Sequence, residues 1–88
     1  MNKTIYLVSD TSYSEGGLYN HVHSCDTKKE AIESANAYID EANENVKEEF
    51  KCNKNFDEYD FGYKEIEIND YHNGYDFIIS ITEEIITI

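Results

Sequence analysis

Residues 27–51, TKKEAIESANAYIDEANENVKEEFK, carry the strongest structural signal in this 88-residue chain. Thr27 followed by Glu30 is the capping-box pattern that begins a helix. At about 100° of rotation per residue, the apolar residues of this stretch fall in one stripe. The stripe consists of Ile32, Ala35, Ile39, Ala42, Val46 and Phe50, with Ala31 and Tyr38 at its edge. Because the window contains no Pro and no Gly, we expect one long amphipathic helix from Thr27 to Lys51.

The sequence after the helix predicts a β-hairpin. Asn73-Gly74 is the preferred pair for a two-residue type I′ turn, and apolar and polar residues alternate on both sides of it. Folding the chain about this turn gives the expected cross-strand pairs, namely His72 with Tyr75, Asp70 with Phe77, Ile68 with Ile79, Ile66 with Ile81 and Lys64 with Glu83. One face of this hairpin would collect isoleucines, as in a half-buried antiparallel ribbon.

The residues before the helix predict a second strand-turn-strand unit. Thr4–Asp10 is rich in strand-forming residues, 13–17 is turn material, and Leu18–Cys25 can return as a partner strand. The order strand, strand, helix, strand, strand predicts an α+β fold in one domain, residues 1–88. We expect a mostly antiparallel four-stranded sheet with the amphipathic helix packed on one face.

Composition narrows the possible functions. Nineteen Asp and Glu against seven Lys, with no Arg, give a formal charge of −12. So small a chain supports a single core with little room for a pocket, and we predict that it is no enzyme and needs no cofactor. The charge disfavours direct binding to nucleic acid or an anionic membrane and favours a basic protein partner. The N-terminal apolar run, Ile5–Val8, is too short for a secretion signal, so we expect a cytoplasmic protein.

One cluster has the residue types of a metal or thiol site. His21, His23 and Cys25 alternate, so on a strand they face the same side, and Cys52 or His72 could complete a zinc site. Structural zinc sites usually show two close ligand pairs, whereas this chain has one cluster. We therefore predict no metal and reduced cysteines, with a metal site or a Cys–His dyad as the enzymatic alternative.

The distribution of the acids is more informative than their number. The first 25 residues hold only Asp10 and Glu15, whereas residues 26–88 hold 17 acids and six Lys, a net charge of −11. The acids of the expected helix lie on the side opposite the apolar stripe, at Glu30, Glu33, Asp40, Glu41, Glu44 and Glu48. Among them Asp40, Glu44 and Glu48 form an i, i+4, i+8 row with a spacing of about 6 Å, which approximates a line of phosphates.

Residues 56–63, FDEYDFGY, interleave aromatic side chains with acids directly after the expected helix. Aromatic side chains provide contact area at low entropic cost, and the flanking acids would steer a basic partner. The alternative is that Phe56 and Phe61 close the end of the core. The acids of this segment also lack the ligand spacing and central glycine of an EF-hand.

These class features resemble the small acidic proteins that phages and other mobile elements make against host defence, including anti-CRISPR proteins and DNA mimics. The resemblance lies in the size, the acidic helix face, the Asp57-Glu58-Tyr59-Asp60 cluster and the sheet-plus-helix plan, and not in a shared motif. It implies a stoichiometric inhibitor that occupies the basic groove of a nucleic-acid-binding effector. The implied contact residues are Glu33, Asp40, Glu41, Glu44, Glu48, Asp57, Glu58, Tyr59 and Asp60.

A second hypothesis is a non-catalytic structural or interaction domain. It would form a homodimer through the apolar strand Phe77–Ile81, if this strand lies at an exposed sheet edge.

Overall fold

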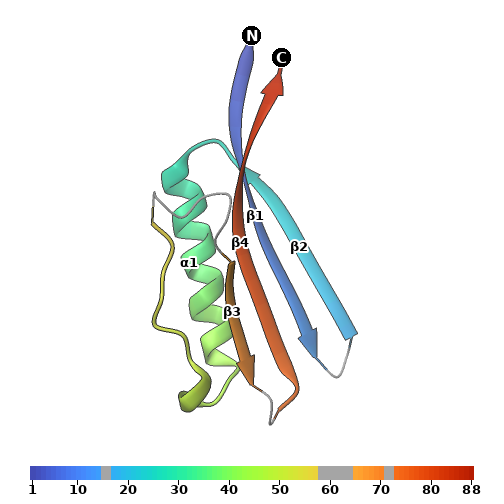
Figure 1. The fold of residues 1–88 in the computed structure, drawn as a ribbon, viewed down its shortest axis with the longest axis vertical. Coiled ribbons are helices and arrows are strands. Elements are labelled where there is room, and N and C mark those ends of the chain that lie inside the picture. The colour runs from blue at the N-terminus through green and yellow to red at the C-terminus, as the bar shows by residue number, and fades with distance from the viewer. Residues whose placement is uncertain (15–16, 58–64, 71–72) are drawn as a thin grey trace.

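The computed structural model describes residues 1–14, 17–57, 65–70 and 73–88. The elements are β1 (Asn2–Ser14), β2 (Gly17–Cys25), α1 (Lys28–Glu44), the short 3₁₀ helix η1 (Glu48–Phe50), β3 (Glu65–Asp70) and β4 (Tyr75–Thr87). The four strands form one antiparallel sheet in the order β2-β1-β4-β3, and α1 lies across one face of it (Figure 1). The predicted α+β architecture is therefore confirmed. Within the described ranges, no helix is both long enough and apolar enough to cross a membrane.

The core lies between α1 and the sheet. The helix contributes mainly small side chains, Ala31, Ala35, Ile39 and Ala42, all of them buried. The sheet contributes larger side chains from three strands, namely Tyr6, Val8, Ile66, Ile68, Ile79 and Ile81. Alanines on the helix let its backbone come close to the sheet, where the isoleucines fill the space. The predicted apolar stripe is thus the buried face, although Ile32 and Phe50 at its margins are only partly buried.

The helix begins where the sequence predicts and ends earlier. The Thr27 hydroxyl accepts a hydrogen bond from the Glu30 backbone N–H at 3.1 Å, as expected of the N-cap. The helix stops at Glu44, however, and not at Lys51. Three residues later the backbone N–H of Lys47 donates to the Asp70 carboxylate at 3.1 Å. This hydrogen bond directs the backbone of Lys47 toward β3, so the chain does not continue as a helix to Lys51.

The C-terminal hairpin differs from the prediction by two residues in register. Asp70 pairs with Tyr75, Ile68 with Phe77 and Ile66 with Ile79. A shift of two preserves the faces of both strands, so the isoleucines still point into the core. The expected partners His72 and Lys64 lie outside the described residues.

The buried side chain of Asp70 explains why Tyr75 pairs with Asp70 and not with His72 as predicted. Its carboxylate accepts hydrogen bonds from the backbone N–H of Asn73 at 3.2 Å and from the Asn73 side-chain amide at 2.8 Å. The Gly74 N–H donates to the Asp70 carbonyl, and Gly74 has a φ of +72°, a conformation that favours glycine. The hairpin is therefore closed around Asp70, and not by a two-residue turn at Asn73-Gly74.

The N-terminal hairpin is longer than predicted. Its pairing runs from Tyr6 with Cys25 to Ser14 with Gly17, so most of the expected turn belongs to the strands. At the opposite end, β1 and β4 continue past β2 and β3 as a projecting two-stranded ribbon that holds both termini (Figure 1). We call residues 1–5 and 84–88 the terminal ribbon.

The position of β4 bears on the self-association hypothesis. This strand is central, and its Phe77–Ile81 segment is paired with β1 on one side and mostly with β3 on the other. The expectation of an exposed edge at Phe77–Ile81 is therefore wrong. Strand β4 is exposed instead within the terminal ribbon, where Ile85 and Ile88 are 69% and 68% accessible.

Two asparagines on α1 hold the chain that returns from the helix to β3. Asn43 accepts from the Cys52 N–H at 2.9 Å and donates to the Cys52 carbonyl at 2.8 Å. Two turns earlier, Asn36 makes the same pair of bonds with Phe56, at 2.8 and 3.4 Å. Each side-chain amide thus bonds both the backbone N–H and the backbone carbonyl of one residue in the return segment, as a neighbouring strand would.

Candidate functional site

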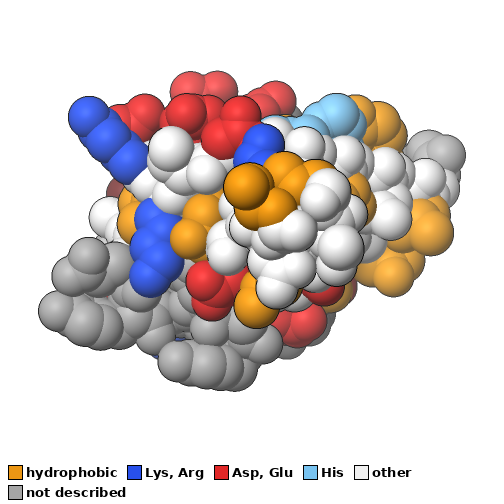
Figure 2. Space-filling view, turned by 90° about the horizontal axis from the view of Figure 1, so that it is seen from above, with side chains coloured by type: hydrophobic (Ala, Val, Ile, Leu, Met, Phe, Trp, Pro, Cys, Tyr) orange, Lys and Arg blue, Asp and Glu red, His pale blue; other side chains and the backbone are white. Residues whose placement is uncertain are grey.

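The acids predicted to bind a partner are exposed on α1, but not as one row. Glu33, Asp40 and Glu44 are exposed, and we call these three residues the acidic surface. Figure 2 shows a group of acidic side chains along one side of the molecule, with lysine and histidine side chains beside it and further acids on the opposite side. Glu48 does not continue the row, because it lies in η1, where it forms an ion pair with Lys51 at 2.9 Å.

The remaining predicted contact residues have separate positions. Glu41 is exposed but turns toward the sheet, where it lines a hollow described below. Asp57 is exposed, and Glu58, Tyr59 and Asp60 lie outside the described residues. Phe56 is buried at the end of the core, as the alternative interpretation of the 56–63 segment expected, whereas Phe61 is not described.

Few positive charges neutralise α1. Its two lysines, Lys28 and Lys29, lie in the first turn. Within the described part of the chain, the ion pairs are Lys3 with Asp26 and Lys51 with Glu48. Neither pair involves the acidic surface, so its three carboxylates face solvent without a basic partner among these residues.

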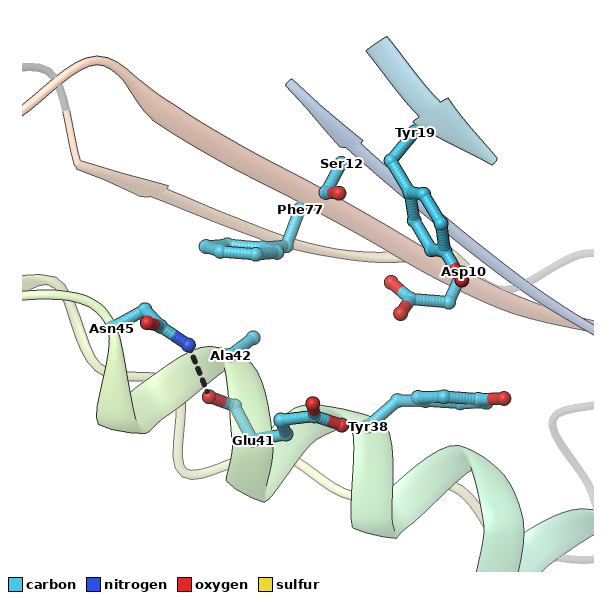
Figure 3. A pocket seen from close by; sticks show the side chains of 8 residues that line it. All are labelled: Asp10, Ser12, Tyr19, Tyr38, Glu41, Ala42, Asn45 and Phe77. Atoms are coloured by element: carbon cyan, nitrogen blue, oxygen red, sulfur yellow. Dashed lines mark hydrogen bonds between the residues drawn. The ribbon is translucent and has the colours of Figure 1, made fainter. Parts of the chain in front are cut away.

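A hollow of about 140 Å³ opens between α1 and the sheet next to the acidic surface. We call it the tyrosine hollow. Its lining residues come from β1, β2, α1, the residue after α1, and β4, and are Asp10, Ser12, Tyr19, Tyr38, Glu41, Ala42, Asn45 and Phe77. Figure 3 shows Asp10 pointing from the sheet toward α1, with Glu41 and Tyr38 on the opposite wall. Two carboxylates and three aromatic rings therefore converge from different elements.

The surroundings of the tyrosine hollow raise the pKa values of two of its ionisable groups, Asp10 and Tyr38. Burial, followed by repulsion from Glu41, raises the pKa of Asp10, and His21 opposes the shift. Burial, then repulsion from Asp10, raises the pKa of the Tyr38 hydroxyl. The hollow therefore disfavours negative charge on its own groups and would be stabilised by a cation.

The predicted histidine cluster lies beside this hollow. His21, His23 and Cys25 project from β2 on the same face as Tyr6 and Val8, which is the face covered by α1. Both ring nitrogens of His23 are occupied, Nε2 by the Ser34 hydroxyl at 2.9 Å and Nδ1 by the Tyr38 hydroxyl at 3.2 Å. The described residues contain no group of three or more side chains placed to hold a metal ion. His23 instead connects β2 to α1.

A nucleophilic role finds little support in the geometry. Burial, followed by Glu30 and Asp26, raises the pKa of the Cys25 thiol, which keeps it protonated at neutral pH. Cys52 lies at the opposite flank of α1, next to Asn43. The Ser34–His23–Tyr38 chain has the order of a nucleophile, a base and an orienting group. Ser34 lies inside α1, however, where the nearby backbone N–H groups are used by the helix and cannot stabilise an oxyanion.

A second pair of carboxylates lies on the sheet face away from α1. The charge of Asp76 is the main cause that raises the pKa of Glu67, and burial and a hydrogen bond between the two side chains add to it. Asp76 Oδ1 is buried and accepts no hydrogen bond from the residues that the structure describes. Asp76 therefore favours the protonated form of Glu67, and the two side chains form a pair of acids on the outer face of the sheet.

No protein-family model matches the chain, and no curated protein or solved structure shows significant similarity to it.

Sequence reasoning found Glu41 and missed the hollow that it lines. Asp10 and Tyr19 belong to the predicted N-terminal strands, but their register with each other was not predicted. Strand alternation places Asp10 on the same face as the buried Val8, and an acid at an apolar-facing position is the one sequence signal that pointed here.

Proposed function

We propose that this protein is a stoichiometric inhibitor that binds the basic, nucleic-acid-binding groove of a host defence effector through the acidic surface of α1. The observation that supports the proposal is the outward-facing set of Glu33, Asp40 and Glu44, which has no basic partner among the described residues. Simple solubility is satisfied by interspersed charges of both signs. A one-sided acidic surface adds long-range attraction to a positively charged partner.

The geometry of α1 suits this role. Asp40 and Glu44 are one turn apart, which separates them by about 6 Å along the axis, and Glu33 lies about two turns before Asp40 on the same side. A rigid helix therefore presents carboxylates in a line, as a nucleic-acid strand presents phosphates. The buried alanine face of α1 fixes this line relative to the sheet.

The test is displacement of labelled DNA from purified nucleic-acid-binding effectors, CRISPR effector complexes among them, at low and high salt. We expect the wild-type protein to displace DNA at low salt and to lose affinity as salt rises. The triple variant Glu33→Lys, Asp40→Lys and Glu44→Lys should bind at least about tenfold more weakly, because it reverses the steering charge.

A matched control changes the net charge equally at other exposed acids, with Glu65→Lys, Glu83→Lys and Glu84→Lys. This variant should retain most of the activity. If both triples lose affinity to the same extent, net charge and not the acidic surface drives binding. If no effector loses its DNA, the proposed function is wrong.

A second candidate function is self-association through the terminal ribbon. Its support is the exposure of Met1, Ile85 and Ile88 at the end of the molecule, where β1 and β4 pair with each other and with no other described strand. Sedimentation of the wild type and of an Ile85→Lys, Ile88→Lys variant tests it. A monomer at all concentrations would exclude this candidate.

A further inference from the structure

The tyrosine hollow contains acceptors and aromatic faces but no cation. Asp10 receives no hydrogen bond from any described residue, and the lining residues include no lysine. The chain has no arginine anywhere in its sequence. His21 lies beside Asp10 on β2 and opposes the rise in the pKa of Asp10, but it does not line the hollow, so a cation inside the hollow would come from another molecule.

We propose that the tyrosine hollow binds the guanidinium group of an arginine side chain supplied by the partner protein. This inference deepens the proposed function and rests on it for the identity of the partner. It makes the hollow the anchoring point beside the acidic surface, with Glu41 the α1 acid that turns into the hollow.

The geometry favours a planar cation. Asp10 reaches in from β1 and Glu41 from α1, so donors on two edges of one guanidinium can meet one carboxylate each (Figure 3). Tyr19, Tyr38 and Phe77 provide aromatic surfaces, and guanidinium groups stack on such faces more readily than ammonium groups.

The size and the electrostatics agree with this occupant. A cavity of about 150 Å³ is enough to hold a benzene ring, and the hollow measures about 140 Å³. A guanidinium head fits this space, and its aliphatic stem can leave through the open mouth. The pKa of Asp10 is raised by burial and by Glu41, and a bound cation would relieve both effects. Buried arginines in aromatic pockets are also a common source of interface affinity.

The experiment is an NMR titration of the intact protein with N-acetylarginine amide. The matched ligands are N-acetylcitrulline amide, which has the same shape without the charge, and N-acetyllysine amide with a free side-chain amine. We expect arginine to shift the ring signals of Tyr19, Tyr38 and Phe77, and citrulline to leave them unchanged. The lysine ligand should bind several-fold more weakly.

The matched variants each remove one negative charge. Asp10→Asn removes it inside the hollow, and Glu83→Gln removes it at an exposed position of β4. Asp10→Asn should weaken arginine binding about tenfold or more, while Glu83→Gln should leave it unchanged. Signal dispersion in the NMR spectra shows that each variant is folded. Equal shifts with citrulline, equal binding of lysine, or equal loss in both variants would overturn the proposal.

This test is separate from that of the proposed function. The titration uses a small ligand and needs no effector, so its failure leaves the acidic surface as the contact. Conversely, if the effector assays fail and the titration succeeds, the hollow is an arginine site in a protein of another function.

Discussion

Two aspartates project from the sheet toward α1 and have opposite surroundings. Asp70, at the end of β3, is fully buried and accepts hydrogen bonds from the Lys47 N–H and from both the backbone and side chain of Asn73. Asp10, on β1, is only partly buried, faces Glu41, and receives no hydrogen bond from a described residue. The Asp70 carboxylate holds neighbouring segments together through hydrogen bonds, whereas the Asp10 carboxylate can accept hydrogen bonds from a ligand.

The difference follows the two flanks of α1. On the flank toward β3, polar side chains are paired with backbone groups, as Asn36, Asn43 and Asp70 show. On the flank toward β2, the rings of Tyr19 and Tyr38 line an open space, with the Tyr38 hydroxyl bonded to His23, while the Asp10 carboxylate at this space has no hydrogen-bond donor among the described residues. A satisfied buried polar group stabilises the fold, while an unsatisfied one at an opening favours a ligand. We therefore assign the first flank to stability and the second to binding.

The largest expected effect is that of Asp70→Asn. The amide group retains one acceptor and places N–H atoms against the donors of Lys47 and Asn73, so at least one buried donor loses its partner. We expect a loss of about 1.5–3 kcal/mol in the free energy of unfolding, measured by urea denaturation.

The same substitution at Asp10 is the control for Asp70→Asn. Because Asp10 accepts no hydrogen bond from a described residue, Asp10→Asn should leave stability unchanged or raise it. Equal destabilisation at both positions would remove the distinction between the two flanks.

A smaller effect is expected from Asn43→Ala. This change removes two hydrogen bonds to Cys52 and should cost about 1–2 kcal/mol. Asn53→Ala alters an exposed asparagine in the same return segment and should have an effect within about 0.5 kcal/mol. Similar urea midpoints for the two variants would show that the return segment is held by other contacts.

The smallest expected effect is a pH dependence of stability. It comes from Asp10, on the flank of α1 toward β2, and from Glu67, on the sheet face away from α1. The folded state raises the pKa of Asp10 and of Glu67, so it binds protons more tightly than the unfolded chain. Their contribution to stability is present in full below the ordinary values of 3.8 and 4.5, and is lost as pH rises through the folded-state pKa values.

The melting temperature of the wild type should therefore rise as pH is lowered from about 7 to about 5. The double variant Asp10→Asn, Glu67→Gln should flatten this slope, and the control Glu83→Gln, Glu84→Gln should not. A slope that is the same in both double variants would attribute the effect to net charge alone.

Local signals predicted most of the fold. Thr27 and Glu30 predicted the start of α1, and the alternation of isoleucines around Asn73-Gly74 predicted which face of β3 and β4 is buried. These features depend on neighbouring residues, and a register shift of two did not alter them. The end of α1 and the register itself were wrong because both depend on Asp70, whose partners at Lys47 and Asn73 lie in different elements.

The candidate site divides in the same way. Helical periodicity alone determined that Glu33, Asp40 and Glu44 share one exposed side of α1. Only the tertiary structure brought Asp10 and Tyr19 of the N-terminal hairpin against Tyr38 and Glu41 of α1. The sequence by itself determines faces, because a face depends on the local repeat of a helix or a strand. It could not determine the hollow, because a cavity depends on how closely two elements approach, which the packing of the whole core decides.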